Sequence, residues 1–229
     1  YLSRDGGKTW VNKGLKKSEH ISKIIVHPTD SNTLWVAAQG PLWSSGGERG
    51  LYKTTDGGAT WRQTMNLDEW TGVTDLLINP RDPNVLYAAS WQRHRNVAAY
   101  MGGGPGTAIY KSVDGGESWR KLKTGLPSSN MGKIGLAISP MQPDVIYAAI
   151  ELDRKKGGVY RSANAGESYE SAKARIEKEE GITLRELIKQ RLEEEYQLFR
   201  QILKNTEALN LVDKRITEGL KTAKGNATS

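Results

Sequence analysis

Acidic side chains outside any repeated motif are the first candidates for chemistry in this sequence. They are Glu48, Asp68, Glu69, Asp75, Glu151 and Asp153. Hydrolysis of a glycosidic bond would need two such carboxylates facing one cleft, about 5 to 10 Å apart. Asp75 is the best candidate, because it lies in an apolar run near an expected inner strand, where the related segments carry Lys23 and Lys133. The pattern favours the alternative that Asp75 is a polar residue on the solvated side of a strand.

A cluster of aromatic and basic residues is the second candidate. Trp91, Arg93, His94 and Arg95 follow an apolar run and precede a long insertion. Two arginines beside a Trp and a His could bind an anion or stack on a sugar. Trp43 lies in the corresponding loop one repeat earlier, so Trp43 and Trp91 could line the same ligand-binding face. The competing interpretation is a solvated surface loop with two packing tryptophans.

Composition removes several classes of function. The 229 residues contain no cysteine, which excludes disulfides, thiolate metal sites and a cysteine nucleophile. The net charge of +7 is spread along the chain without a dense basic block, so a nucleic-acid partner is not expected. No apolar run is long enough to span a membrane. No His/Asp cluster has metal-ligand spacing, and the glycine-rich stretch 102–106 lacks the lysine of a phosphate loop. We therefore expect no metal and no cofactor, and we interpret 102–106 as a flexible connection.

A turn motif recurs along the chain at intervals of about 50 to 60 residues, which is the length of a four-stranded unit. Its polar and aromatic positions are Asp5 and Trp10, Asp56 and Trp61, Asp114 and Trp119, and a degraded copy with Asn164 and Tyr169. A short Asp carboxylate can accept hydrogen bonds from backbone N–H groups of its own turn, and the following Gly-Gly supplies positive φ angles. We expect the aromatic ring to pack between neighbouring sheets. The motif therefore predicts a structural turn instead of a reaction centre.

The segments between these turns predict strands. Short apolar runs end at Pro28, Pro80 and Pro140, and each is followed by a polar turn and a second β-prone run. Two further strands flank each repeated turn. Four antiparallel neighbours per repeat are typical of a β-propeller blade, so we predict a mainly β propeller region over residues 1–170.

The turns resemble the Asp-box, or BNR, repeat, whose pattern Ser/Thr-x-Asp-x-Gly-x-Thr/Ser-Trp is matched by residues 54–61. The wider segments 84–93, 103–106 and 133–140 look most like large secreted bacterial proteins labelled sortilin-like or "glycosyl hydrolase". This resemblance implies an Asp-box propeller in an extracellular, periplasmic or cell-surface location. It does not imply an activity, because sialidases, xyloglucan-cleaving endoglucanases and sortilin share the box.

The composition changes after residue 170. Thr183 and Glu186 form a capping box, and apolar residues follow at helical spacing. We predict that residues 171–229 form a helical hairpin, or a long helix with a break near Asn205. Such a segment is too small for a core of its own. It could dock on its own domain, or residues 183–220 could serve self-association or assembly with a partner.

Three turns and a remnant are fewer than the four to eight blades of a closed propeller. We therefore expect further blades before Tyr1 and a discontinuity between Glu170 and Ser171, or closure by self-association. The favoured function is an exported binding or scaffolding protein that recognises a protein or glycan on a propeller face, as part of a larger polypeptide or surface assembly. The alternatives are a glycoside hydrolase using Asp75 and an assembly subunit of a membrane-associated complex.

Overall fold

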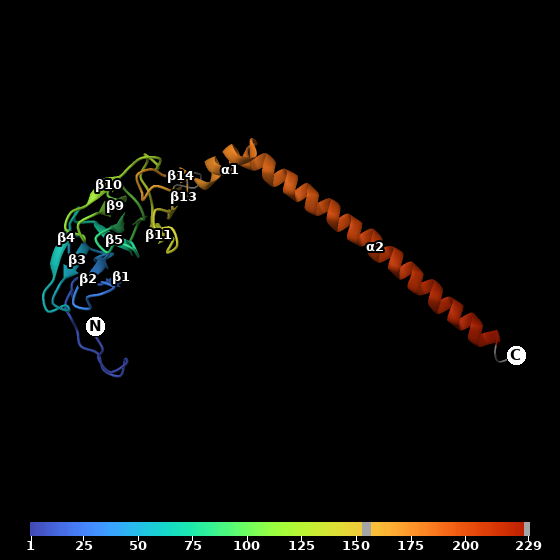
Figure 1. Cartoon of the computed structure of the whole chain (residues 1–229), viewed down its shortest axis with the longest axis horizontal. Coiled ribbons are helices and arrows are strands. Elements are labelled where there is room, and N and C mark those ends of the chain that lie inside the picture. Colours follow the sequence, from blue (N-terminus) through green and yellow to red (C-terminus); the bar gives the residue numbers. More distant parts are fainter. Residues whose placement is uncertain (153–156, 227–229) are drawn as a thin grey trace. The chain divides into compact units, whose positions relative to one another are not determined.

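The computed structural model describes residues 1–152 and 157–226, so the acidic candidate Asp153 lies outside the described residues. The chain divides into two compact units, Tyr1–Ala174 and Arg175–Ser229. The first unit holds the β structure, and the second consists mostly of helix (Figure 1).

Three four-stranded antiparallel sheets, with one short two-stranded sheet, make up the β structure of the first unit. Blade one is β1 (Ile21–Val26), β2 (Leu34–Ala38), β3 (Gly50–Thr54) and β4 (Arg62–Met65). Blade two is β5 (Thr71–Ile78), β6 (Leu86–Gln92), β9 (Ile109–Ser112) and β10 (Arg120–Leu122). Blade three is β11 (Ile134–Ile138), β12 (Ile146–Ile150), β13 (Gly158–Ser162) and β14 (Glu170–Ser171). The prediction of a mainly β protein with propeller blades is confirmed.

The strands β1, β5 and β11 lie next to one another and form the inner edge of the three blades. Each consists of the apolar run that the sequence predicted, and each ends shortly before its proline. Proline has no N–H to give to a strand ladder, so the pairing with the second strand of the blade stops there. The prolines therefore mark where the inner strands end.

The core lies between the blades. Blades one and two enclose a cluster of buried residues that includes Trp35, Leu51, Met65, Val73, Leu76 and Leu86. Blades two and three enclose a second cluster, which includes Tyr87, Ile109, Leu122, Ile134, Ile146 and Tyr169. Each cluster draws side chains from two sheets, so neighbouring blades stabilise one another by apolar burial.

The insertion between β6 and β9 has structure of its own. It contains a short hairpin of β7 (His94–Arg95) and β8 (Tyr100–Met101). The glycine-rich stretch 102–106, expected to be a flexible connection, instead packs closely. A Cβ atom on Gly104 would lie 2.3 Å from the Oε1 of Gln92, and one on Gly106 would lie 2.1 Å from the Oγ1 of Thr71. These glycines are required because neighbouring side chains occupy the space of a Cβ.

The second unit contains the long helix α2 (Leu184–Asn226), which follows α1 (Ala172–Glu180). Gly181, with φ of 69°, ends α1, and the predicted capping box begins α2. The N–H of Glu186 donates to the Thr183 hydroxyl at 3.3 Å, and the N–H of Thr183 donates to the Glu186 carboxylate at 2.9 Å. α2 is continuous through Asn205, so the structure has no hairpin turn there. Asn and Thr cost a helix only a few tenths of a kcal/mol, roughly, and the Thr206 hydroxyl bonds back to the Ile202 carbonyl at 2.9 Å.

No helix among the described residues is long and apolar enough to cross a membrane.

Candidate functional site

The two ends of the sheets are built differently. At one end, which we call the turn face, the turn between the last two strands of each blade bonds to the turn between its first two strands. In blade one the N–H of Gly57 donates to the Asn32 carbonyl at 3.0 Å. At the other end, the loop face, four loops meet: residues 39–49, 66–70, 93–108 and 123–133. Backbone hydrogen bonds join these loops across the blades. The loop face therefore gathers residues from distant parts of the sequence.

On the turn face, each Asp of the repeated motif is saturated by its own turn. Asp56 accepts hydrogen bonds from the hydroxyls of Thr54 and Thr60, both at 2.6 Å, and from the N–H groups of Ala59 and Thr60 at 2.9 Å. These bonds hold the pKa of the Asp56 carboxyl well below its usual range. Asp5 and Asp114 have the same arrangement. Such a carboxylate has no free position for a substrate.

The degraded copy keeps this geometry with an amide. The Asn164 oxygen accepts from the Ser168 N–H at 3.0 Å, and its amide nitrogen donates to the Ser168 hydroxyl at 2.9 Å. The aromatic positions differ more: Tyr169 is buried and Trp61 and Trp119 are half-buried, but Trp10 is 60% exposed. The expectation of inter-sheet packing is wrong for Trp10. Its turn is flanked by an isolated bridge between residues 2 and 11 instead of by two strands of a blade, so the ring has no pair of sheets to pack between.

Asp75 lies at a bulge of β5 and is half-buried. Its Oδ2 accepts a hydrogen bond from the N–H of Leu136 on β11 at 2.8 Å. Its Oδ1 accepts from the N–H of Leu76 at 2.8 Å and lies 3.8 Å from the Nζ of Lys23 on β1. The carboxylate thus contacts the inner strands of all three blades. In this position Asp75 links strands, and both of its oxygens are engaged.

Other acidic candidates lie on the loop face. Glu48 accepts a hydrogen bond from the N–H of Lys17 at 2.6 Å, and Asp68 accepts one from the Thr71 hydroxyl at 2.7 Å. Glu151 lies at the end of β12 and also reaches this face. These carboxylates therefore support loop conformation. Within the described part of the chain, no group of three or more His, Asp or Glu residues could hold a metal ion.

An exposed aromatic patch, formed by Trp43, Arg95 and Tyr100, is the most accessible part of the predicted cluster. The Arg95 guanidinium lies 5.4 Å from the Trp43 ring and 5.9 Å from the Tyr100 ring. The N–H of Arg95 donates to the Leu42 carbonyl at 3.0 Å, which holds the β7–β8 hairpin beside the loop of blade one. Trp43 is 61% exposed, so its ring is available to a ligand.

The other predicted cluster members are less accessible. Trp91 is 9% exposed, its indole donates to the Gly102 carbonyl at 2.8 Å, and Arg93 and Lys133 lie over its ring. Arg93 is 7% exposed, and burial lowers its pKa. The His94 ring lies 4.3 Å from that of Trp70. The structure places these residues on the same face as Trp43, but Trp91 and Arg93 are buried there and His94 is half-buried.

Arg49 and Trp70 belong to this face and were missed in the sequence. Arg49 is 2% exposed and lies over the Trp70 ring at 5.9 Å. Its guanidinium donates to four backbone carbonyls of one loop, those of Gln39, Pro41, Ser44 and Gly46. Burial, followed by the nearby charge of Arg93, lowers its pKa. Two signals in the sequence could have pointed to these residues. Arg49 lies in a glycine-rich loop, and Trp70 lies outside the repeated turns.

Similarity searches point to propeller proteins. The Sortilin-Vps10 family (sortilin, neurotensin receptor 3) matches residues 1–103. The xyloglucanase Xgh74A of Acetivibrio thermocellus is 30% identical over 131 residues, which cover 52% of this chain and 14% of that protein. An oligoxyloglucan-reducing end-specific xyloglucanase of Emericella nidulans is 21% identical over 212 residues, covering 66% and 24%. The chain thus spans a quarter of these relatives or less.

Solved structures support the fold. An ancestral GH74 enzyme superposes with a TM-score of 0.50 at 20% identity, covering 66% of this chain and 18% of that chain. A GH74 enzyme of Niastella koreensis also gives a TM-score of 0.50, at 19% identity, with 66% and 22% coverage. These similarities, together with the three sheets, define the first unit as propeller blades. The likeness to these two solved structures is a likeness of fold.

Proposed function

We propose that this chain is a segment of an exported propeller protein of the glycoside hydrolase type, and that its loop face binds a polysaccharide. The exposed patch of Trp43, Arg95 and Tyr100 carries the proposal. A flat ring offers a surface to the apolar face of a sugar, and a guanidinium donates hydrogen bonds to its hydroxyls. The names of the relatives support xyloglucan as the polysaccharide. An extracellular, periplasmic or cell-surface location is part of the same proposal.

We further propose that this segment contributes substrate contacts instead of a complete catalytic pair. Glycoside hydrolysis requires two carboxylates with defined protonation states and access to the sugar. Both oxygens of Asp75 are engaged, one by the N–H of Leu136 in blade three and the other by the N–H of Leu76 on its own strand, which supports a structural role. The earlier hypothesis of Asp75 as a catalytic carboxylate is therefore less well supported than binding by the aromatic patch.

A pair of tryptophan variants tests the binding proposal. Trp43 and Trp10 have almost the same exposed fraction, 61% and 60%, so truncating either should change stability little. Binding of xyloglucan oligosaccharides to the full chain, measured by isothermal titration calorimetry, should weaken about tenfold or more in Trp43→Ala, which corresponds to roughly 1.4 kcal/mol. It should be unchanged in Trp10→Ala. Equal affinities in the two variants would place the saccharide elsewhere and contradict the proposal.

A second proposed role concerns α2. Its apolar side chains are about half exposed or more along one seam: Ile188, Leu192, Phe199, Ile202, Leu209 and Ile216. These residues are four, seven, three, seven and seven positions apart, which keeps them in one heptad register, as in the seam of a two-stranded coiled coil. We propose that this seam pairs with α2 of a second copy of the chain. Protein partners, including those of a membrane-associated assembly, are the competing hypothesis.

Sedimentation equilibrium tests the pairing of α2. Ile202→Asp places a charge in the seam, and it should turn a concentration-dependent dimer into a monomer. Gln190→Asp, which adds the same charge outside the seam, should leave the dimer intact. A wild-type chain that stays monomeric at high micromolar concentration would rule out self-pairing.

A further inference from the structure

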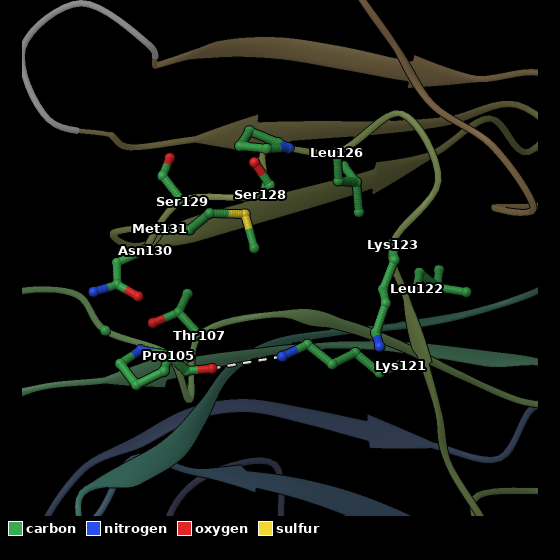
Figure 2. Close-up of a pocket in the computed structure, with 12 residues that line it drawn as sticks. Pro105, Thr107, Lys121, Leu122, Lys123, Leu126, Ser128, Ser129, Asn130 and Met131 are labelled. Carbon is green, nitrogen blue, oxygen red and sulfur yellow. Dashed lines mark hydrogen bonds between the residues drawn. The ribbon is translucent and has the colours of Figure 1, made fainter.

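A cavity of about 390 Å³ opens beside blade two on the loop face. Its walls come from three segments: the glycine-rich part of the β6–β9 loop, the strand β10, and the β10–β11 loop. Figure 2 shows Lys121 and Lys123 on one side, with Ser129 and Asn130 across the cavity from them. This cavity includes none of the residues of the aromatic patch. It is a separate feature of the same face.

The residues that line the cavity combine positive charge with an apolar floor. Leu122 and Met131 are 4% and 7% exposed, and Leu126 adds a half-buried apolar side chain. Lys121 and Lys123 bring two ammonium groups, and no Asp or Glu is among the described lining residues. Two cations without a facing carboxylate favour an anionic ligand.

Neither lysine is strongly held by the protein. Lys121 reaches only the Pro105 carbonyl, at 3.5 Å (Figure 2). Within the described residues, neither Lys121 nor Lys123 forms an ion pair. Their ammonium groups therefore keep donors for a ligand, since each carries three N–H bonds.

The walls of the cavity are formed by tight backbone contacts. The N–H of Gly104 donates to the Met131 carbonyl at 3.2 Å, and a Cβ atom on Gly103 would lie 2.5 Å from that same carbonyl oxygen. The N–H of Leu126 donates to the Lys123 carbonyl at 3.2 Å, which closes the loop on the other side. A site that is already formed loses less conformational entropy when a ligand binds.

We infer that this cavity binds an acidic sugar residue, of the uronic acid type. The carboxylate would interact with the ammonium groups of Lys121 and Lys123. The sugar hydroxyls would bond to the Asn130 amide and the Ser129 hydroxyl, and the apolar ring face would pack on Met131. This inference rests on the proposed saccharide-binding function and adds a substrate class to it: a charged sugar in addition to a neutral backbone.

A charge-removing double variant tests the inference. Tetragalacturonate should bind the full chain, and its affinity should fall about tenfold or more in Lys121→Gln/Lys123→Gln. Lys8→Gln/Lys16→Gln removes the same charge at exposed lysines outside the cavity, and it should bind like the wild type. The affinity should also decrease with added salt, because the ion pairs are exposed. Cellotetraose, a neutral probe of equal length, should not depend on Lys121 and Lys123.

The outcomes separate this inference from the proposed function. Equal affinity of the two probes, or full binding of tetragalacturonate by the cavity variant, would overturn the acidic-sugar site. Xyloglucan binding that depends on Trp43 would then still support the loop face as a saccharide surface. Absence of binding of all three saccharides would overturn both proposals. Binding of a peptide with a free carboxyl terminus that depends on Lys121 and Lys123, without any binding of tetragalacturonate, would overturn the acidic-sugar site and assign the cavity to a different carboxylate.

Discussion

The turn face and the loop face close opposite ends of the same three sheets, but they do so by different means. On the turn face, an Asp or Asn accepts hydrogen bonds within a span of a few residues, and the pattern recurs in every blade. Among the described loops of the loop face, no such hydrogen-bond pattern recurs. Arg49 alone fills the base of one loop, and the β7–β8 hairpin occurs in blade two only among the described blades.

The ion pairs between neighbouring blades lie on the turn face and recur from one blade to the next. Glu117, in the turn of blade two, forms ion pairs with Lys53 and Arg62 of blade one. Glu167, in the turn of blade three, binds Lys111 of blade two at 3.0 Å in the same way. The same type of ion pair therefore recurs at both blade interfaces. Because these contacts lie on the turn face, the loops of the loop face can differ between blades. Differences in ligand are expected where the loops differ.

Trp35 gives the largest expected effect and tests whether the turn face supports the blades. Its side chain is 1% exposed, and its indole donates to the Gly115 carbonyl in the turn of blade two at 2.9 Å. Trp35→Ala should lower the free energy of unfolding by about 3–5 kcal/mol, measured by urea denaturation. Tyr147 holds the matching position on β12 and is 41% exposed, so Tyr147→Ala should cost less than about 1 kcal/mol. Similar losses in the two variants would refute this asymmetry.

Arg49 tests whether one side chain holds the loop face. Arg49→Met keeps the apolar stem but leaves four backbone carbonyls without their donor, so we expect a loss of about 2–4 kcal/mol. The effect should be concentrated in residues 39–49, where amide hydrogen exchange should accelerate. Arg95→Met removes an exposed guanidinium of the same face and serves as the control. A uniform increase in exchange across all three blades would mean that Arg49 supports the core instead.

Asp75 tests the inner edge, where the two faces are joined. Asp75→Ala removes the acceptor for the N–H of Leu136 and should destabilise the chain by about 1–3 kcal/mol in urea denaturation. Lys23→Ala should cost less than about 1 kcal/mol, because the ion pair spans 3.8 Å and the lysine side chain is 45% exposed. Reducing-end release, if the protein shows it, should survive Asp75→Asn. Loss of that release in a folded variant would restore Asp75 as a catalytic candidate.

Acid pH should produce the smallest effect and should act on the turn face. The pKa values of the three turn carboxyls lie below the ordinary value of 3.8, and that of Asp5 is about 2. A carboxyl with a lowered folded-state pKa stabilises the fold above its unfolded pKa, and this contribution is lost as the pH falls. The melting temperature should therefore be steady above about pH 5 and fall between about pH 4 and pH 2.

A comparison of variants isolates the turn contribution to this acid dependence. Asp114→Asn copies the arrangement of Asn164, whose amide keeps the turn bonds without a titrating group. This variant should show a weaker decrease of the melting temperature with acid. An unchanged pH profile would assign the acid sensitivity to other carboxyls, such as Glu117, whose pKa is lowered by its hydrogen bond to Lys53.

The repeated turns and inner strands were predictable because their determinants are local. An Asp, two glycines and a hydroxyl within one turn specify its hydrogen bonds, and a proline specifies where a strand ends. The capping box at Thr183 was predictable for the same reason. The unbroken course of α2 through Asn205 was not, since a weak helix former only allows a break and does not require one.

The loop face was predictable only in part. The sequence indicated that Trp43 and Trp91 lie on related loops, but one is exposed and the other is buried under Lys133. That difference depends on the loop from blade three, which lies far along the chain. The position of Asp75 between blades has the same origin, because Leu136 is separated from it by 61 residues.

The sequence by itself determined the blade, its turns and the residue types available at each end of the sheet. Those features depend on hydrogen bonds and φ angles within a few residues, which the local chain encodes. Only the tertiary structure decided which side chains are exposed on the loop face, which carboxylates are engaged, and where a cavity remains. Those outcomes depend on packing between loops of different blades, and no local pattern specifies how such loops meet.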